Sequence, residues 1–251
     1  MSWYEGKHAL VTGGGSGIGA AVAKILKDKG AAVTIVGRSH QKLVAKAAEL
    51  DVSCQVADVS ERQEVGAAFA RAVAANGPIG ILVNNAGAAE AMPFAKMDNN
   101  HWDAMIAVNL TGVFNCTSAA IPGMLANGGG RIVNIASTAA LTGYAYVSAY
   151  CAAKHGVIGL TRALALEYAG KGITVNAVCP GYTDTAIVRD AIERIVGATG
   201  RSHEQALADL VKSNPQGRLI QPEEVADTVI WLCRQESMNG QAIAVAGGEV
   251  M

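Results

Sequence analysis

Charged residues and cysteines are scarce in this sequence, and each shortage excludes a class of protein. Only 16% of the 251 residues are charged and the formal net charge is −1. No basic run is present that would bind nucleic acid or an anionic membrane surface. Hydrophobic residues make up 51% of the chain, so we expect a large buried core rather than disorder.

The cysteines do not form a disulfide or metal-binding pattern. There are five of them, scattered along the chain without a CxxC pair. This usage is typical of small buried side chains in a reducing compartment. Cys151 lacks the pattern of charged partners that would activate a thiol, so we do not expect it to be a nucleophile. No His/Cys cluster has ligand spacing, and we predict no metal site.

The sequence also lacks the features of an exported or membrane-bound protein. Glu5 and Lys7 interrupt the short apolar run of the first residues, which is unlike a signal peptide. We expect no uncharged apolar run to approach the ~20 residues that span a bilayer. The predicted location is the cytoplasm, with no membrane and no nucleic acid among the partners.

Seven short apolar runs alternate with helical patterns along the whole chain. Each run is nearly continuous in hydrophobicity, as expected when helices cover both faces of a parallel sheet. The segments between them have helical periodicity and often stop at glycine. We therefore predict one α/β domain over residues 1–251, with a doubly wound (Rossmann) parallel seven-stranded sheet. The predicted strands lie in residues 8–13, 32–37, 53–58, 80–87, 131–137, 172–181 and 241–248.

A glycine-rich turn, TGGGSGIG at residues 12–19, follows the first predicted strand and opens the first predicted helix. Its glycines allow a tight turn and a close approach of the backbone to a pyrophosphate, which the helix N-terminus attracts. Alone, such a turn is equally well explained as a structural one. Its place between strand and helix favours dinucleotide binding.

The end of the second predicted strand, VTIVGRSH, bears on the choice of cofactor. NAD-binding chains usually place a carboxylate there for the ribose 2′-hydroxyl, whereas this chain has Gly37 followed by Arg38. A guanidinium suits a 2′-phosphate. We predict that NADP(H) is preferred, with NAD(H) as the alternative; Arg38 would then only stack on the adenine.

Two further strand ends carry polar residues that a bound nucleotide could use. Asp58, after the third predicted strand, could accept a hydrogen bond from the adenine amino group or cap a helix. NNAG at residues 84–87 ends the fourth predicted strand, where Asn and Gly permit unusual backbone angles near the ribose.

A tyrosine and a lysine stand four positions apart in SAYCAAKHG, amid small residues. Tyr150 and Lys154 would share one face of a helix, and Ser137 precedes the tyrosine at the end of the fifth predicted strand. By itself the pair is also compatible with an ordinary amphipathic helix.

Taken together, these motifs resemble the short-chain dehydrogenase/reductase family in its small single-domain form. The resemblance covers essentially the whole chain, in the order and spacing of the family. It is carried by TGGGSGIG, Asp58, NNAG, Asn109 in VNLTG, Ser137, Tyr150-x-x-x-Lys154 and Pro180-Gly181. One departure is Ala246, where family members often carry Asp before the last two glycines.

The chemistry of ketone reduction explains why a phenol and an ammonium are paired. Tyr150 would donate a proton to the carbonyl oxygen in reduction and accept it in oxidation. We expect the Lys154 ammonium and the positive charge of the oxidised nicotinamide to lower the phenol pKa from about 10, and Ser137 to hydrogen-bond the carbonyl oxygen. The resemblance further implies that Lys154 contacts the nicotinamide ribose and that Asn109 holds a water in a proton relay.

The resemblance also implies that Tyr182, Thr183 and Thr185 position the nicotinamide carboxamide. The predicted catalytic residues are Asn109, Ser137, Tyr150 and Lys154. The predicted cofactor contacts are Gly13, Ser16, Gly17, Ile18, Gly19, Arg38, Asp58, Val59, Asn85, Ala86, Gly87, Tyr150, Lys154, Pro180, Gly181, Tyr182, Thr183 and Thr185.

Several stretches, among them GRIVNIAST and GRLIQPEEVA, resemble β-ketoacyl reductases, including aromatic polyketide ketoreductases. They favour NADPH-dependent reduction of a 3-oxoacyl thioester or a polyketide-like ketone. The alternatives are an NAD-dependent secondary-alcohol or 3-hydroxyacyl-CoA dehydrogenase and a non-catalytic nucleotide-binding regulatory protein. Family members of this size commonly form tetramers, and the apolar helix after Tyr150 suits a homotetramer.

Residues 186–215 interrupt the alternation of strands and helices with two amphipathic helical stretches. We expect a substrate lid there, the alternative being a plain surface excursion. Arg189, Arg194 and Arg201 could meet a phosphate of phosphopantetheine or CoA. We favour the alternative that they are solvated helix charges.

Overall fold

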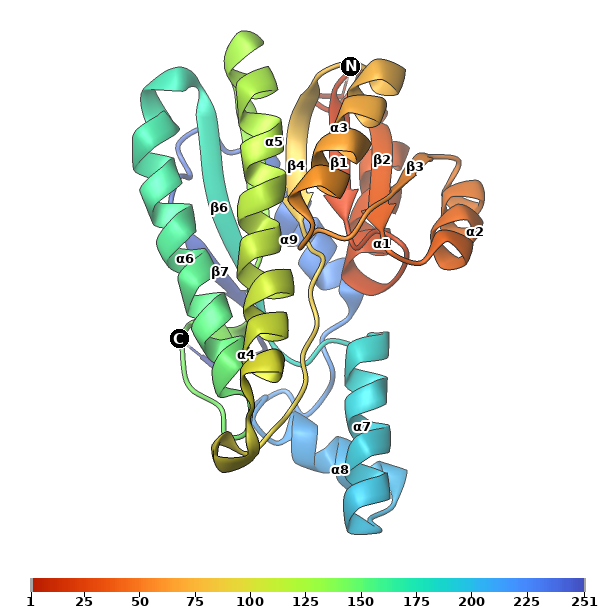
Figure 1. Cartoon of the computed structure of the whole chain (residues 1–251), viewed down its shortest axis with the longest axis vertical. Coiled ribbons are helices and arrows are strands. Elements are labelled where there is room, and N and C mark those ends of the chain that lie inside the picture. The colour runs from red at the N-terminus through yellow and green to blue at the C-terminus, as the bar shows by residue number, and fades with distance from the viewer. Residues whose placement is uncertain (1, 251) are drawn as a thin grey trace.

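The computed structural model describes residues 2–250, and its seven strands form one parallel sheet (Figure 1). The strand order is β3-β2-β1-β4-β5-β6-β7, which confirms the predicted fold class. The strands are β1 (His8–Thr12), β2 (Ala32–Gly37), β3 (Ser53–Val56), β4 (Ile79–Asn84), β5 (Gly130–Ile135), β6 (Ile173–Pro180) and β7 (Ala242–Val245).

Helices cover both faces of this sheet. One face carries α1 (Gly17–Asp28), α2 (His40–Leu50) and α9 (Pro222–Cys233). The other face, towards the viewer in Figure 1, carries α3 (Arg62–Asn76), α5 (Gly112–Ala126) and α6 (Ser148–Tyr168). Short 3₁₀ turns lie at Phe94–Lys96, Thr138–Ala140 and Ala169–Lys171.

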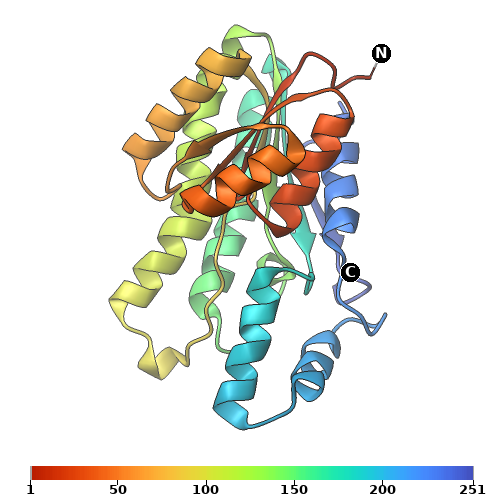
Figure 2. The same cartoon turned by 90° about the vertical axis from the view of Figure 1, so that its right-hand side faces the viewer.

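Two further helices stand away from the sheet. They are α7 (Ala186–Thr199) and α8 (His203–Val211), which extend beyond the carboxyl ends of the strands (Figures 1 and 2). A small apolar cluster around Val188, Ile192 and Ala206 packs them against each other. The elongated shape in Figure 2 results from this projection.

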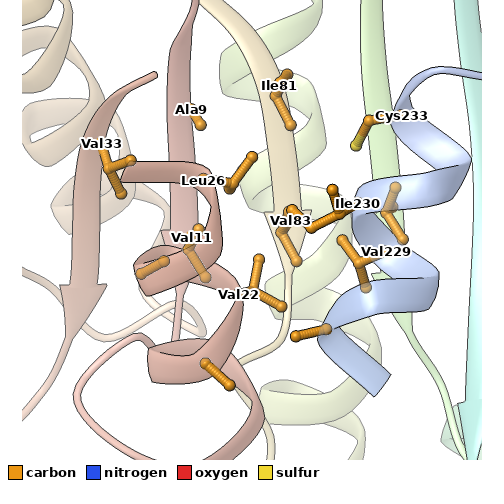
Figure 3. Close-up of a cluster of buried hydrophobic side chains, with 14 of the residues drawn as sticks. Ala9, Val11, Val22, Leu26, Val33, Ile81, Val83, Val229, Ile230 and Cys233 are labelled. Atoms are coloured by element: carbon orange, nitrogen blue, oxygen red, sulfur yellow. The ribbon is translucent and has the colours of Figure 1, made fainter. Parts of the chain in front are cut away.

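The alternation of side chains along β1 shows why the predicted strands are hydrophobic throughout. Ala9 and Val11 face α1 and α9 (Figure 3), whereas Leu10 between them belongs to the core on the opposite face. All three are fully buried. Because helices exclude water from both faces, polar chemistry has room only at the strand ends.

The connections reverse direction between β1 and β4, since β1 leads to β2 on one side and β4 leads to β5 on the other. In an open parallel sheet, the crevice at such a point lies outside the carboxyl ends of the strands and is where ligands bind. The predicted motifs after β1, β2, β4 and β5 therefore meet at one edge.

A buried polar network joins the centre of the sheet to helix α6. Asn84 on β4 donates to Asn134 on β5 over 2.9 Å, and Asn134 donates to Thr161 on α6 over 2.9 Å. Thr161 donates in turn to the carbonyl of Val157. Since buried polar groups cost free energy when unpaired, this network fixes how α6 lies on the sheet.

One expectation about hydrophobic runs is wrong. Residues 104–130 contain no charged residue, and the continuous helix Asn99–Ala126 is long and apolar enough to cross a membrane. Half of its most apolar window is buried inside the fold, as in a core helix. The run is apolar because α5 covers the sheet, where Cys116 and Met124 are buried.

Candidate active site

The glycine-rich turn is packed so tightly that side chains would not fit. A Cβ on Gly13 would lie 2.7 Å from Asn85 Nδ2, and a Cβ on Gly19 would lie 2.5 Å from the same atom. Gly13 also has a φ of +66°, which disfavours other residues. The bare backbone at the start of α1 could therefore hold an anionic group such as a pyrophosphate.

Asn85 builds this turn from the end of β4. Its Nδ2 donates to the carbonyls of Thr12 and Gly13, over 3.0 and 3.2 Å. The Thr12 hydroxyl accepts from the backbone N–H groups of Asn85 and Ala86, both at 3.0 Å. The first and fourth strand ends are thus held together by Thr12, the first residue of the glycine-rich motif, to which the sequence interpretation gave no role of its own.

A cavity of about 160 Å³ adjoins this turn. Its lining residues come from the ends of β1, β2, β3 and β4 and from the helix after β4: Gly13, Gly37, Arg38, Ala57, Val59, Ala86, Gly87 and Val108. Predicted cofactor contacts from four separate motifs thus share one cavity, which is a suitable place for part of a nucleotide.

Arg38 and Asp58 flank this region as an ion pair. Arg38 Nη1 lies 3.5 Å from Asp58 Oδ2, and the Arg38 side chain is 68% exposed. Asp58 Oδ1 accepts from the backbone and hydroxyl of Ser60, so Asp58 caps a turn rather than α3, which begins after Glu61. Burial tends to raise the Asp58 pKa, but the Ser60 hydrogen bonds and the Arg38 charge hold it below its ordinary value.

Asn109 is fully buried in a π-helical turn, Ala107–Thr111, between α4 (Asn99–Ile106) and α5. Its Nδ2 donates to the carbonyls of Ala88 and Met105, and its Oδ1 accepts from the Ala88 N–H. Such turns often mark functional sites, because they free carbonyls of the helix for other partners. Here the hydrogen bonds to Ala88 and Met105 hold the Asn109 side chain beside the loop that follows NNAG.

Ser137, Tyr150 and Lys154 converge beyond the end of β5. Lys154 is buried, and its Nζ donates to the carbonyl of Ile135 over 2.9 Å and lies 5.6 Å from the centre of the Tyr150 ring. The Ser137 side chain lies close enough to the Tyr150 phenol to oppose the rise of its pKa. A Cβ on Gly87 would lie 2.8 Å from Asn109 Oδ1 and 3.6 Å from Lys154 Nζ, so the four predicted catalytic residues share one site.

The pKa values of the tyrosine–lysine pair differ from the sequence expectation. Burial raises the pKa of Tyr150 to about 12 and lowers that of Lys154 to about 8. The prediction that Lys154 lowers the phenol pKa is therefore wrong for the chain by itself. The physical reason is that Lys154 bonds to Ile135 rather than to the phenol, while removal from water disfavours both charged forms.

The segment after β6 closes the site from the other side. Thr183 donates to the carbonyl of Gly181 over 3.0 Å, and Thr185 is the residue before α7. Thr185 Cγ2 would lie 3.0 Å from a Cβ on Gly17, so this segment touches the glycine-rich turn. Tyr182 is half-buried, and burial raises its pKa.

The remaining predicted contacts differ in their exposure. Ser16 is exposed before α1, and its side chain makes no capping hydrogen bond. Ile18 is partly buried against the core of the α1 face. Pro180 is buried at the end of β6.

The lid arginines are mostly paired. Arg189 contacts Asp184 at 2.6 Å, and Arg201 contacts Asp209, which agrees with the interpretation as solvated helix charges. Arg194 differs, because its Nη2 reaches the carbonyl of Ala89 over 3.4 Å. Helix α7 is therefore joined to the loop that follows NNAG.

A second hollow of about 840 Å³ lies at the opposite, amino ends of the strands, and Arg131 is part of its lining. The Arg131 guanidinium donates to the carbonyls of Cys233, Gly130 and Gly172. The hydrogen bonds of Arg131 therefore stabilise the fold. Within residues 2–250, no group of three or more His, Cys, Asp or Glu side chains could hold a metal ion.

Tyr144 and Glu249 are polar residues beside the site that the sequence interpretation missed. The Tyr144 hydroxyl contacts Glu249 Oε1 at 2.7 Å and Thr138 Oγ1 at 2.9 Å. Thr138 directly follows Ser137. No spacing signal could have found this contact, since the two residues are separated by most of the second half of the chain.

Comparison with known proteins agrees with this geometry. The family model for short chain dehydrogenases matches residues 7–195. An acetoacetyl-CoA reductase of Rhizobium meliloti is 42% identical, with 96% of this chain and 97% of the relative covered. A D-beta-hydroxybutyrate dehydrogenase of Cupriavidus necator is 39% identical, with 91% of both covered. A crystal structure of a variant of actinorhodin polyketide ketoreductase with NADPH superimposes with a TM-score of 0.94 at 38% identity, covering 99% of both chains.

The buried ammonium of Lys154 makes a prediction about stability and pH. The folded state releases the Lys154 proton near pH 8, whereas the unfolded chain holds it until its ordinary value of 10.5. Between pH 8 and pH 10.5 the unfolded state therefore binds more protons than the folded state. The free energy of unfolding consequently increases as the pH rises. Between pH 8 and pH 10.5, the free energy of unfolding of the wild type should increase by roughly 3 kcal/mol relative to that of Lys154→Met.

Urea unfolding of both proteins at a series of pH values measures this difference. Replacement of the exposed Lys42 of α2 by Met is the control for loss of a lysine at the surface. Parallel curves for the wild type and Lys154→Met would contradict the prediction.

Proposed function

The chain belongs to the short-chain dehydrogenase family, and from this we propose that it reduces the ketone of a 3-oxoacyl thioester or a polyketide-like substrate with NADPH. The observation that carries the proposal is the convergence of Ser137, Tyr150 and Lys154 beside the glycine-rich turn. We also propose that the protein acts in the cytoplasm, without a nucleic-acid partner.

Tyr150 is the proposed general acid. Because burial raises its pKa to about 12, the phenol is protonated at neutral pH and ready to give its proton to the carbonyl oxygen. Ser137 hydrogen-bonds the same oxygen and stabilises the negative charge that develops there. When bound, the nicotinamide supplies the hydride to the carbonyl carbon.

Lys154 and Asn109 are the proposed route by which Tyr150 regains a proton. Both lie against Gly87, whose missing side chain leaves room between Asn109 Oδ1 and Lys154 Nζ. A water held there by Asn109 would pass protons toward Lys154, whose pKa of about 8 is close to neutral pH. Lys154 would also bind the nicotinamide ribose.

The residues present fit a dinucleotide. The crowded backbone of Gly13 and Gly19 at the start of α1 suits the pyrophosphate. The 160 Å³ cavity suits the adenosine half. The exposed Arg38 guanidinium suits a 2′-phosphate, and the segment with Tyr182, Thr183 and Thr185 would contact the carboxamide.

The substrate is proposed from the relatives and from the helices beyond the sheet. One relative is named for an acyl-CoA ketone and a solved structure for a polyketide ketone. Helices α7 and α8 would form a lid over either substrate, with Arg194 joining the lid to Ala89. The similarity to a D-beta-hydroxybutyrate dehydrogenase supports the alternative of an NAD-dependent alcohol dehydrogenase, which Arg38 disfavours.

We also propose a homotetramer that buries the outer faces of α5 and α6. Phe114 on α5 is 48% exposed and Leu166 on α6 is 84% exposed. The two helices lie side by side on one face of the sheet in Figures 1 and 2. Exposed large apolar side chains on the helices of one face are the feature that supports an interface between subunits here.

The first experiment compares two substrates and one variant. Purified protein with NADPH is given an acetoacetyl thioester or a bulky bicyclic ketone, and NADPH absorbance is followed. Turnover of either ketone is expected, and Tyr150→Phe should lower kcat by about 10²- to 10⁴-fold with NADPH binding retained. Tyr168→Phe, at the far end of α6, is the control. A Tyr150→Phe enzyme with full activity would overturn the mechanism.

Arg38 tests the choice of cofactor. Arg38→Ala should weaken NADPH binding by about 10- to 100-fold, because a charge-assisted contact to the 2′-phosphate is lost. NADH binding, measured by the same fluorescence titration, should change by less than about 3-fold. Arg71→Ala, an exposed arginine of α3, is the matched control. An equal loss for both cofactors would refute a 2′-phosphate contact.

The interface is tested by mass in solution. Sedimentation of the wild type at micromolar concentration should give a tetramer, and the double variant Phe114→Asp/Leu166→Asp should give smaller species because charges would be buried. Val44→Asp on α2, where the valine is 43% exposed, should leave the mass unchanged. A wild-type monomer contradicts the proposal.

A further inference from the structure

The last described residues of the chain pack against the segment that follows α8. A Cβ on Gly247 would lie 2.0 Å from Asn214 Oδ1, and one on Gly248 would lie 3.3 Å from Pro215 Cγ. Both glycines have positive φ, so the backbone turns here where a side chain would not fit. Asn214 is itself buried and holds the following turn through Gln216 N–H and the Arg218 carbonyl.

This turn places Glu249 beside the end of β6. Glu249 Oε2 would lie 2.7 Å from a Cβ on Gly181, and the Gly181 N–H donates to the carbonyl of Val245. Oε2 is buried and has no hydrogen-bond partner among residues 2–250. A carboxylate oxygen in that position is costly, so its other oxygen must be firmly held.

That other oxygen is held by Tyr144. The phenol has one proton and a carboxylate only accepts, so Tyr144 donates to Glu249 Oε1 over 2.7 Å. Tyr144 then accepts from the Thr138 hydroxyl, 2.9 Å away. Burial and the Glu249 carboxylate both raise the pKa of Tyr144, which keeps this phenol protonated and able to donate.

Thr138 connects the contact to the candidate active site. It follows Ser137 and begins the 3₁₀ turn Thr138–Ala140, and its carbonyl accepts from the N–H groups of Leu141 and Thr142. Ser137 Oγ accepts from the Ala139 N–H in the same turn. Any shift of Thr138 therefore moves the Ser137 hydroxyl relative to Tyr150.

We propose that Glu249 is a positioning residue, which acts through Tyr144 and Thr138 to hold Ser137 in place. The proposal rests on the proposed role of Ser137 in ketone reduction. It also assigns a task to the C-terminal segment, which contacts the segment after α8, the end of β6 and the turn after β5. A hydrogen-bond acceptor is needed at Oε1, and the charge of the carboxylate is not.

Kinetics of three variants test the link. Glu249→Ala and Tyr144→Phe should each lower kcat by about 5- to 10-fold, the effect of losing one hydrogen bond, with the KM for NADPH unchanged. Glu249→Gln keeps the acceptor and should stay within about 3-fold of the wild type. The double variant Glu249→Ala/Tyr144→Phe should be no worse than the poorer single variant, because both break one link.

Full activity of Glu249→Ala would overturn the link, and so would losses that add in the double variant. A Glu249→Gln enzyme as slow as Glu249→Ala would likewise overturn it, since the charge would then be what matters. Tyr146→Phe is the matched control, because Tyr146 is 64% exposed and lies two residues from Tyr144. Thermal midpoints of all variants identify any general loss of folding.

Hydrogen exchange provides a readout that needs no turnover. Amides of the peptide covering residues 137–147 should exchange faster in Glu249→Ala and in Tyr144→Phe than in the wild type or Glu249→Gln. A peptide from α9 serves as the internal control. If the wild type reduces neither ketone, the proposed function fails, but hydrogen exchange still tests whether Glu249 positions the turn after β5. Unchanged exchange in Glu249→Ala would refute that positioning role.

Discussion

The covering of both faces of the parallel sheet by helices is the constraint on which the site depends. Side chains such as Ala9, Leu10 and Val11 are apolar on either side of a strand because each side meets a helix. Backbone amides and polar side chains are then left free only at the strand ends. Because all seven strands run parallel, the ends of β1, β2, β4, β5 and β6 bring distant motifs to one edge.

The same burial determines the charge state of the paired tyrosine and lysine. Helix α6 is anchored on the sheet through Thr161 and Asn134, so Lys154 lies under the edge with Ile135 as its hydrogen-bond acceptor. Removal from water disfavours the ammonium and the phenolate alike. The chain thus holds a neutral phenol, whose pKa is about 12, next to an amine whose pKa is about 8, so only the amine titrates close to neutral pH.

Much of this arrangement could be predicted from the sequence, because the relevant signals are local. A strand, a glycine-rich turn and an i, i+4 pair on a helix are each recognised from neighbouring residues. The sheet and the positions of Gly13, Tyr150 and Lys154 could therefore be predicted from the sequence. The contact of Tyr144 with Glu249 joins segments 105 residues apart, and no periodicity records it. The Tyr150 pKa depends on burial, which only the folded structure defines. The uncharged run of residues 104–130 is likewise explained only by the packing of α5 on the sheet.

The protonation states bear on the direction of the proposed reaction. Oxidation of an alcohol needs the phenolate as base, and a phenol with a pKa of about 12 supplies little of it at neutral pH without help from a positively charged neighbour. Reduction needs the phenol itself, which the chain already stabilises by burial. The residues around Tyr150 therefore favour the proton-donating role in the ground state.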